Sequence, residues 1–459
     1  MMNRREVLAG LGASAVMAGS AARAQSALSS IMASSGLGGV TSAALLDLGT
    51  GQILESHNPD LPRPPASVTK ALTAQYALLG LGSGYRFSTR LMTTGAVSGG
   101  VLQGDLFLVG SGDPQLDADQ LADLARQLAA RGVRQVNGRF LTVATALPQL
   151  TEIDSEQPDH VAYNPGLGGL NLNYNTVYLQ WRSGALSLTA RAERNAPQVH
   201  GISISRANRG GPTFTYSGST GGEQWSVASG AVSGAGSRNL PVHYPARYAG
   251  EVFRILAAGA GVSVPPAQAA TQAGGTVLAE VSSDPLSEIV RDCMRYSNNL
   301  TAEVIGLAAS RNVGLPFGDL RQSGNSMTRW MAGQLGTRNA NFVDHSGLSD
   351  QSQISARDMV VYLAASEWGD ILHGSMKEMQ VGNSNSFHAK TGTLNFVDAL
   401  AGFMQGRSGR RMAFAIFAGD PATRARIPMS QRDNAPGASA WGARSRQQER
   451  LLLERWSAY

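Results

Sequence analysis

The stretch "PPASVTKALTAQ", residues 64–75, places Ser67 and Lys70 three positions apart at the expected start of a helix. The chain contains only three lysines, Lys70, Lys377 and Lys390, against 35 arginines. Residues three apart share one face of a helix, so the Lys70 amine can reach the Ser67 hydroxyl. A lysine can lose its proton when its surroundings lower its pKa, whereas an arginine cannot. The spacing therefore predicts a nucleophilic serine activated by a lysine base.

A second motif, Ser297-Asn298-Asn299, lies between two helical patterns, one at 286–294 and one at 300–310. A connection between helices can project side chains into a cleft, so Ser297 is a candidate relay that passes a proton to a leaving amine. The Asn299 amide is a candidate for holding a substrate peptide group. The alternative interpretation is that these residues only cap the second helix.

The third motif, Lys390-Thr391-Gly392-Thr393, is predicted to open a strand near the C-terminus. Gly392 would let a ligand approach the backbone closely, because strand interiors otherwise avoid glycine. Lys390 offers a positive charge, and the Thr391 and Thr393 hydroxyls offer donors to a substrate carboxylate. The Thr393 backbone N–H can form an oxyanion hole with that of Ser67. Two of the three lysines fall inside these motifs, which disfavours the alternatives of a solvated lysine at 70 and a strand-edge lysine at 390.

Strand and helix signals divide the chain into a main domain and an insertion. Hairpin patterns at 40–56 and 396–420, with helical patterns between them, indicate one sheet built from distant segments of an α/β (α+β) protein. Short alternating runs and Gly/Ser-rich turns predominate in the middle of the chain, with one clear helix at 118–132. The predicted segments are a signal peptide at 1–24, a first catalytic part at 25–90, inserted β-rich domains at 91–270 with an approximate nested subdomain at 116–170, and a second catalytic part at 271–459.

The first residues read as an export signal, with a positive end, an apolar stretch and the cleavage site Ala22-Arg23-Ala24. An amphipathic first helix is the alternative, but no polar face interrupts the apolar stretch. The pair Arg4-Arg5 fits a twin-arginine signal in part. We therefore expect a periplasmic protein. No later apolar run reaches the roughly 18 residues needed for a transmembrane segment.

Composition narrows the classes of partner. The formal net charge of +5, without a basic run, argues against a nucleic-acid partner. Cys293 is the only cysteine, so no intramolecular disulfide can form. The seven histidines show no metal-binding spacing, and we expect neither a metal nor another cofactor. No G-x-S-x-G motif follows the signal, which disfavours a Ser-His-Asp hydrolase.

The three motifs in this order resemble those of the penicillin-recognising serine enzymes, the penicillin-binding proteins and serine β-lactamases. Within that group the chain is similar to the class C low-molecular-mass penicillin-binding proteins, the D-alanyl-D-alanine carboxypeptidase/endopeptidase family. The likeness spans nearly all of the chain after the signal, through "GVLQGDLFLVGSGDPQL", "PLSEIVRDCMRYSNNLTAEV", "NFVDHSGLSDQSQISARDMVVYL" and "HAKTGTL". The interval of 230 residues between Ser67 and Ser297 is typical of that family, whose members carry inserted domains there, whereas β-lactamases have a much shorter interval.

The resemblance implies a penicillin-binding, serine β-lactamase-like transpeptidase domain, an antiparallel sheet flanked by helices, with a large, mostly β insertion of one or two nested domains. It implies peptidoglycan stem peptides ending in D-Ala-D-Ala as substrates and β-lactam antibiotics as covalent inhibitors. Endopeptidase activity on D-amino-acid cross-links would follow from the same steps. The implied roles are Ser67 as acyl-ester nucleophile, Lys70 as base, Ser297 as proton shuttle, Asn299 as substrate binder, and Lys390, Thr391, Gly392 and Thr393 as carboxylate and oxyanion contacts.

Two departures from the family pattern bear on substrate preference and activity level. Asp344-His345-Ser346-Gly347-Leu348 stands where the family has D-G-S-G-L, and "LTVATALPQL" stands where an acidic Asp-Asp-Ser stretch is frequent. Two alternative functions share the same residues. A serine β-lactamase or esterase would need a glutamate motif that activates water, and the sequence shows none. A catalytically silent peptidoglycan-binding protein is disfavoured by the intact motifs.

Overall fold

The computed structural model describes residues 28–365, 369–381 and 385–459. The predicted signal peptide at 1–24 lies outside these residues. Within the described part of the chain, no helix is both long and apolar enough to cross a bilayer.

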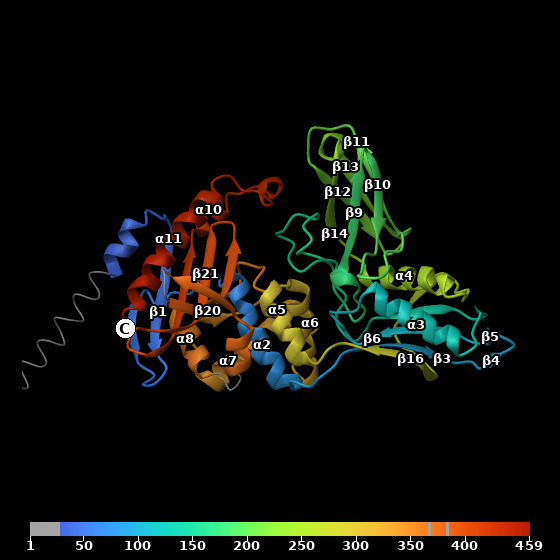
Figure 1. Cartoon of the computed structure of the whole chain (residues 1–459), viewed down its shortest axis with the longest axis horizontal. Helices are drawn as coiled ribbons and strands as arrows, with labels where there is room; N and C mark the ends of the chain where they lie inside the picture. The colour runs from blue at the N-terminus through green and yellow to red at the C-terminus, as the bar shows by residue number, and fades with distance from the viewer. Residues whose placement is uncertain (1–27, 366–368, 382–384) are drawn as a thin grey trace, which may run out of the picture.

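The catalytic domain is built on a six-stranded antiparallel sheet in the order β19-β20-β21-β22-β1-β2 (Figure 1). β1 (Val40–Asp47) and β2 (Ile53–His57) form the N-terminal hairpin, while β21 (Val397–Gln405) and β22 (Arg411–Gly419) form the C-terminal one. β1 pairs with β22 along its whole length. The prediction of one sheet made from distant segments is therefore confirmed.

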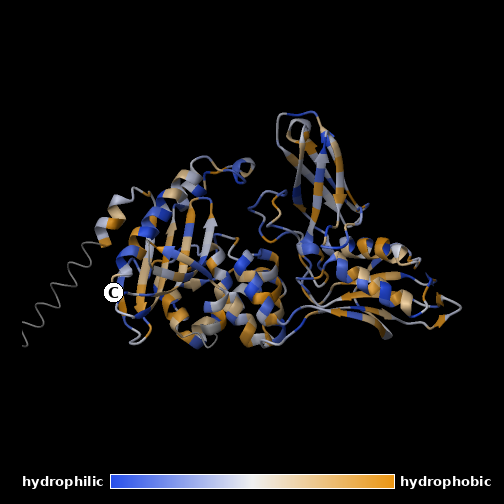
Figure 2. Cartoon of the chain, viewed as in Figure 1, coloured by the Kyte–Doolittle hydropathy of each residue, from blue (hydrophilic) through white to orange (hydrophobic). Residues whose placement is uncertain are grey.

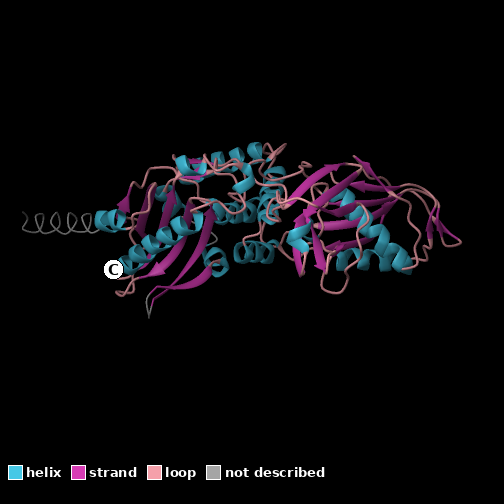
Figure 3. Cartoon of the chain, turned by 90° about the horizontal axis from the view of Figure 1, so that it is seen from above, coloured by secondary structure: helices cyan, strands magenta, loops and turns pink. Residues whose placement is uncertain are grey.

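Helices cover both faces of this sheet (Figure 3). Alternate residues of β22 point to opposite faces, so Ala415 and Phe417 join the larger core while Phe414 and Ile416 join the smaller one. Figure 2 shows hydrophobic residues along the strands and on the helices packed against them. The larger core contains α2 (Thr69–Leu81), α5 (Leu286–Tyr296), α6 (Asn299–Asn312), α7 (Leu320–Leu335), α8 (Ala356–Ala364) and residues near α9 (Gly369–Ser375).

The terminal helix α11 (Ala438–Trp456) packs on the other face, where Leu452, Leu453 and Trp456 are buried. The buried residues recur every three or four positions, so one face of α11 covers this side of the sheet. The remaining elements of the domain are η1 (Ala66–Val68), β17 (Ala340–Asn341), β18 (Gln353–Ile354), β19 (Lys377–Val381), β20 (Asn385–Leu394), α10 (Pro421–Arg424) and η4 (Met429–Gln431).

The insertion contains a five-stranded sheet in the order β15-β8-β6-β3-β16, two three-stranded sheets that rise from it, and a small three-stranded sheet in the order β4-β5-β7 (Figure 1). The inner sheet and its helices are β3 (Ser88–Thr93), β6 (Leu106–Gly110), α3 (Ala118–Ala130), β8 (Phe140–Val143), α4 (Pro245–Gly259), β15 (Ala267–Ala270) and β16 (Thr276–Ser282). The outer sheets are β9 (Thr176–Arg182), β10 (Ala185–Thr189) and β14 (Ala235–Pro241), and β11 (Ile202–Ala207), β12 (Phe214–Ser219) and β13 (Gly222–Ala228). Minor elements are β4 (Val97–Ser98), β5 (Val101–Leu102), β7 (Gln135–Val136), η2 (Asn173–Asn175) and η3 (Ser229–Val232).

The insertion differs in three respects from the sequence expectation. Its pairing extends beyond 91–270, because β3 begins at Ser88 and its partner β16 ends at Ser282. The segment 116–170 is not a separate subdomain, since α3 packs on α4 and β8 belongs to the five-stranded sheet. The two outer sheets, within residues 176–241, stand apart instead. A second insertion helix, α4, was not predicted. Alternation along the chain indicates strands but not which distant strands pair.

Candidate active site

Ser67 lies in the short turn η1, directly before α2, at the bottom of a cleft. Ala66 precedes it with φ of 45°, a left-handed conformation that is strained for a residue with a Cβ. The sequence predicted Ser67 in the first turn of the helix, whereas the structure places it in η1, two residues before α2 begins at Thr69. The hydroxyl therefore faces the cleft while α2 continues into the core.

Lys70 is almost completely buried, with 1% of its surface exposed. Its Nζ lies 2.8 Å from Ser67 Oγ, 2.7 Å from Asn299 Oδ1 and 2.8 Å from the Ser346 carbonyl oxygen. Burial lowers the pKa of Lys70 to about 8, although the carboxyl groups of Glu303 and Asp344 oppose the shift. A lysine with this pKa is neutral in about a tenth of molecules at pH 7, far more than an ordinary lysine.

The three partners of Lys70 define what its neutral form does. Asn299 Oδ1 and the Ser346 carbonyl oxygen are acceptors only, so each takes one N–H of the amine. A neutral amine has two N–H groups and one lone pair, and the lone pair is left to face the Ser67 hydroxyl. The geometry therefore suits removal of the Ser67 proton.

The connection between α5 and α6 presents Ser297 and Asn299 as the sequence predicted. Ser297 ends α5 in a left-handed conformation with φ of 58°. Asn298 caps α6, because its Oδ1 accepts from the Thr301 N–H at 2.8 Å. Of the three residues in the motif, only Asn298 caps the helix. Its neighbours Ser297 and Asn299 line the cleft.

The Asn299 amide is already occupied on both sides. Its Oδ1 holds Lys70, and its Nδ2 donates to the Tyr163 carbonyl oxygen at 2.9 Å. Tyr163 belongs to the insertion, so Asn299 ties the insertion to the base. One N–H and one lone pair of the amide remain for a ligand.

The Lys390 motif lies in the second half of β20, so the expectation that it opens a strand differs from the structure. β19 pairs with β20 only as far as Lys377 opposite Ala389. Among the described residues, no strand pairs with the segment 390–394 on that side. This open edge can accept an extended peptide.

The side chains of the motif have separate environments. Lys390 is buried, with Nζ 2.9 Å from Ser297 Oγ and 2.8 Å from the Thr391 carbonyl oxygen. Burial, followed by the positive charge of Lys70, lowers the pKa of Lys390 to about 7. Thr391 and Thr393 are exposed, and Thr393 lines the cleft.

Gly392 has a role other than the expected approach of a ligand. A Cβ at this position would lie 2.5 Å from the Pro65 carbonyl oxygen and 2.8 Å from the Ser67 nitrogen. Such contacts are closer than van der Waals distance. Gly392 therefore lets the turn that carries Ser67 pack directly on β20, which brings the first and third motifs together.

The loop Asp344–Leu348, noted in the sequence only as a departure from a family pattern, supports the base. Glu303 of α6 is buried and accepts from the N–H groups of His345 at 2.9 Å and Ser346 at 2.8 Å. This pairing orients the Ser346 carbonyl oxygen toward Lys70. The sequence analysis did not single out Glu303. The pattern that could have indicated it is an acidic residue among the apolar residues of the helix at 300–310.

His345 fills the position where the family pattern has glycine. Its Nε2 lies 2.7 Å from Ser323 Oγ, and its ring stacks on Tyr76. Burial lowers the pKa of His345 to about 3, so the ring is neutral. A Cβ at Gly306 of α6 would overlap this ring, so Gly306 makes room for the histidine.

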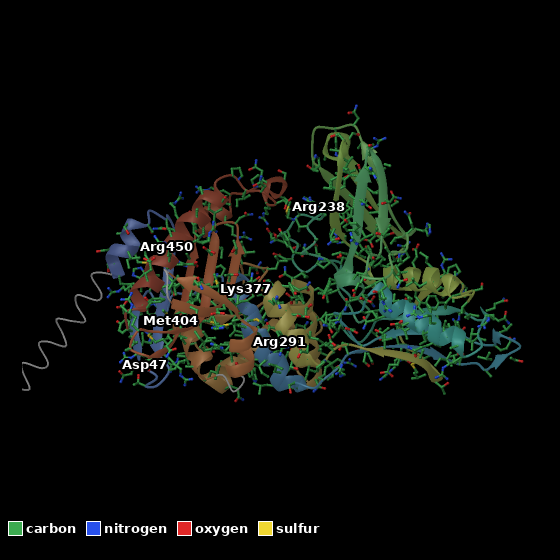
Figure 4. The ribbon with its side chains drawn as sticks, viewed as in Figure 1. Asp47, Arg238, Arg291, Lys377, Met404 and Arg450 are labelled. Atoms are coloured by element: carbon green, nitrogen blue, oxygen red, sulfur yellow. The ribbon has the colours of Figure 1, made fainter. Side chains whose placement is uncertain are left out.

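The cleft around Ser67 has a volume of about 500 Å³. Gln157 and Tyr163 of the insertion line the cleft, as do Arg432 and Asp433 of the loop after η4. This loop contacts the insertion directly, because Asp433 Oδ2 lies 3.1 Å from His160 Nε2 and 3.8 Å from Arg238. Figure 4 labels Arg238 at this junction.

In the described residues, no three His, Cys, Asp or Glu side chains gather as a metal site.

The antiparallel sheet between two layers of helices, with a serine and a buried lysine at its edge, defines the class of penicillin-recognising serine hydrolases. The profile of the D-Ala-D-Ala carboxypeptidase 3 (S13) family matches residues 24–435, and the chain belongs to this family. The predicted enzyme class, a serine-type D-alanyl-D-alanine carboxypeptidase, is thereby confirmed.

Known proteins of similar sequence and structure agree with this assignment. A D-alanyl-D-alanine carboxypeptidase of Actinomadura sp. (strain R39) is 28% identical over 451 residues, covering 83% of this chain and 77% of the relative. The carboxypeptidase DacB of Mycolicibacterium smegmatis is 27% identical, covering 82% and 76%. The crystal structure of Haemophilus influenzae penicillin binding protein 4 superposes with a TM-score of 0.76 at 20% identity, covering 94% and 99%. The predicted fold class is confirmed.

Proposed function

We propose that this chain is a periplasmic D-alanyl-D-alanine carboxypeptidase, and also an endopeptidase, which cleaves peptidoglycan stem peptides through an acyl-enzyme on Ser67. The observation that carries the proposal is the position of Lys70 Nζ, held by two acceptor-only oxygens and 2.8 Å from Ser67 Oγ. The sequence at 1–24 supports export, with cleavage after Ala24.

In the first step neutral Lys70 takes the Ser67 proton, and Oγ attacks the carbonyl carbon of the penultimate D-Ala. The substrate lies along the open edge of β20, with its carboxylate near Lys390, Thr391 and Thr393. The N–H groups of Ser67 and Thr393 stabilise the oxyanion. The close packing of Gly392 on the Ser67 turn supports this pairing of donors.

In the second step the tetrahedral intermediate collapses and the amine of the terminal D-Ala leaves. Ser297 donates a proton to that amine and is reprotonated by Lys390, whose Nζ lies 2.9 Å away. Water then attacks the ester carbonyl and passes a proton through Ser297 back to Lys390. Lys70 returns its proton to the departing Ser67 oxygen. Cross-linked peptides react identically, except that the leaving amine belongs to a second stem peptide.

The two lysines act as one titrating pair, because the charge of Lys70 lowers the pKa of Lys390. A bound carboxylate favours the protonated form of Lys390. The charge on Lys390 then favours the neutral form of Lys70. Substrate binding itself therefore places the proton where catalysis needs it.

A β-lactamase would require rapid hydrolysis of the penicilloyl-enzyme. Glu303 lies behind Lys70 and is bound to the backbone of His345 and Ser346, so it is not placed to activate a water at the ester. We therefore propose penicillin as a slowly released covalent inhibitor. A silent binding protein is disfavoured by the preserved Lys70 geometry.

Purified protein should be incubated with muropeptides and the products weighed by mass spectrometry. Loss of one D-Ala from pentapeptides shows carboxypeptidase activity, and loss of dimers shows endopeptidase activity. Fluorescent penicillin should label the protein, and Ser67→Ala should abolish the label while Ser205→Ala, on exposed β11, retains it. Absence of both D-Ala release and labelling would overturn the proposal.

A further inference from the structure

A buried pair of carboxyl groups lies behind the cleft, and the reaction scheme above does not use it. Asp398 of β21 stands directly opposite Thr393 of β20. Opposite residues of an antiparallel pair point to the same face of the sheet. The Thr393 hydroxyl accordingly lies 3.5 Å from Asp398 Oδ1, which is the long end of hydrogen-bonding distance.

Helix α11 closes this face and supplies the second acid, Glu449. Asp398 and Glu449 are 5% and 8% exposed, so both are shielded from solvent. Asp398 Oδ2 and Glu449 Oε1 have no hydrogen-bond partner among the described residues. Two buried carboxylates that each leave one oxygen without a partner are costly when both are charged, so the pair retains a proton.

The surroundings of the two acids give them different pKa values. Burial raises the pKa of Asp398 to about 6, opposed by the Ser445 hydroxyl and by Arg446. Burial and the charge of Asp398 raise the pKa of Glu449 well above its usual range. Glu449 therefore keeps its proton while Asp398 ionises. The other groups that act on Asp398 are Thr393 itself and the backbone of Ala399.

We infer that Asp398 is a positioning residue whose protonation decides whether the Thr393 hydroxyl donates into the cleft or back to Asp398. Ionised Asp398 can only accept, so it takes the Thr393 proton and leaves lone pairs facing the substrate. Neutral Asp398 donates to Thr393 Oγ1, and Thr393 then donates to the substrate carboxylate. The inference rests on the proposed contact between Thr393 and that carboxylate.

Arg446 links the pair to the substrate side. It lies on α11 between Ser445 and Glu449, and it also lines the cleft. Its charge favours ionised Asp398, whereas burial opposes ionisation. The balance between burial and the charge of Arg446 sets the pH at which Thr393 changes its donor direction.

The test is the pH dependence of KM and kcat for a D-Ala-D-Ala peptide and for the same peptide with a C-terminal amide. For the free acid, we expect KM to rise about tenfold as Asp398 ionises, because a hydrogen bond to a charged group is lost. Deprotonation of Lys390 should cause a second rise in KM at higher pH. The amide should show neither rise, and kcat should not follow the ionisation of Asp398.

Asp398→Asn should remove the lower rise of KM and keep the upper one, since an asparagine amide donates to Thr393 at every pH. Arg446→Gln should move the lower rise to a higher pH, because the positive charge that favours ionised Asp398 is lost. Glu449→Gln should leave the lower rise in place, because Glu449 stays neutral while Asp398 ionises. Glu454→Gln, exposed on the same helix, is the matched control and should change nothing.

An unaltered lower rise in Asp398→Asn, or in Arg446→Gln if the first variant does not fold, would overturn the inference. A fall in kcat without a change in the KM profile would indicate a merely structural role and would also overturn it. Failure of the proposed function is separate, because the wild-type protein would then release no D-Ala at any pH.

Discussion

Lys70 Nζ and Asn299 Oδ1 lie 2.7 Å apart, although the two residues are separated by 229 positions in the sequence. This contact joins α2, which carries the base Lys70, to α6, which follows the insertion. Asn299 also donates to the Tyr163 carbonyl oxygen. The base, the second motif and the insertion are therefore held by one amide group.

Lys70→Arg should abolish acylation while the protein still folds. A guanidinium stays protonated at all working pH values and cannot accept the Ser67 proton. The rate of labelling by fluorescent penicillin should fall by at least about 100-fold, within the range that a general base contributes. The control is Lys377→Arg, at an exposed position of β19, which should label normally. Normal labelling of Lys70→Arg would exclude Lys70 as the base.

Acylation should depend on pH through both lysines. With an ester substrate that lacks a carboxylate, the rate should rise with pH and level off above the Lys70 pKa of about 8, because the neutral amine is the reactive form. With penicillin, which carries a carboxylate, the rate should also fall above the Lys390 pKa of about 7. The penicillin profile should thus be a bell with its maximum between these values. Stopped-flow acylation measures both profiles, and identical profiles would contradict the role of Lys390.

Glu303→Gln should slow acylation although Glu303 belongs to none of the three motifs. The carboxylate accepts from two backbone N–H groups of the loop at His345 and Ser346, and an amide can replace only one of these contacts. Movement of the Ser346 carbonyl should cost about 10- to 100-fold in rate, as misplacements of about 1 Å do. The control is Glu288→Gln, on the partly exposed face of α5. An unchanged acylation rate would show that the loop does not orient Lys70.

Gly306→Ala should destabilise the protein, because the new methyl group would overlap the buried ring of His345. Overpacking of this kind costs about 1 to 3 kcal/mol. Gly333→Ala in α7 is the matched control, since nothing lies within 4 Å of its added Cβ. It should stabilise the protein by about 0.5 kcal/mol through helix propensity. Urea unfolding gives both values, and equal stability of the two variants would contradict this packing.

Much of the fold was predictable because local patterns report local structure. The hairpins at both chain ends, α2 and α3 all followed from periodicity and turn residues. The insertion was harder to predict, since β3 pairs with β16 across more than 180 residues and alternation does not identify such partners. Helix α4 was not predicted, although Pro245 at its first turn is a helix-start signal.

The sequence by itself determined which chemical groups this protein uses. Three motifs in a chain with three lysines named Ser67, Lys70, Ser297, Asn299 and Lys390 as candidates, because each residue type suits one step of acyl transfer. Only the tertiary structure decided how those groups behave. Burial, not spacing, lowers the pKa of Lys70, and the Ser346 carbonyl and Asn299 amide aim its lone pair. These effects depend on desolvation and on contacts between segments more than 200 residues apart, which no local pattern records.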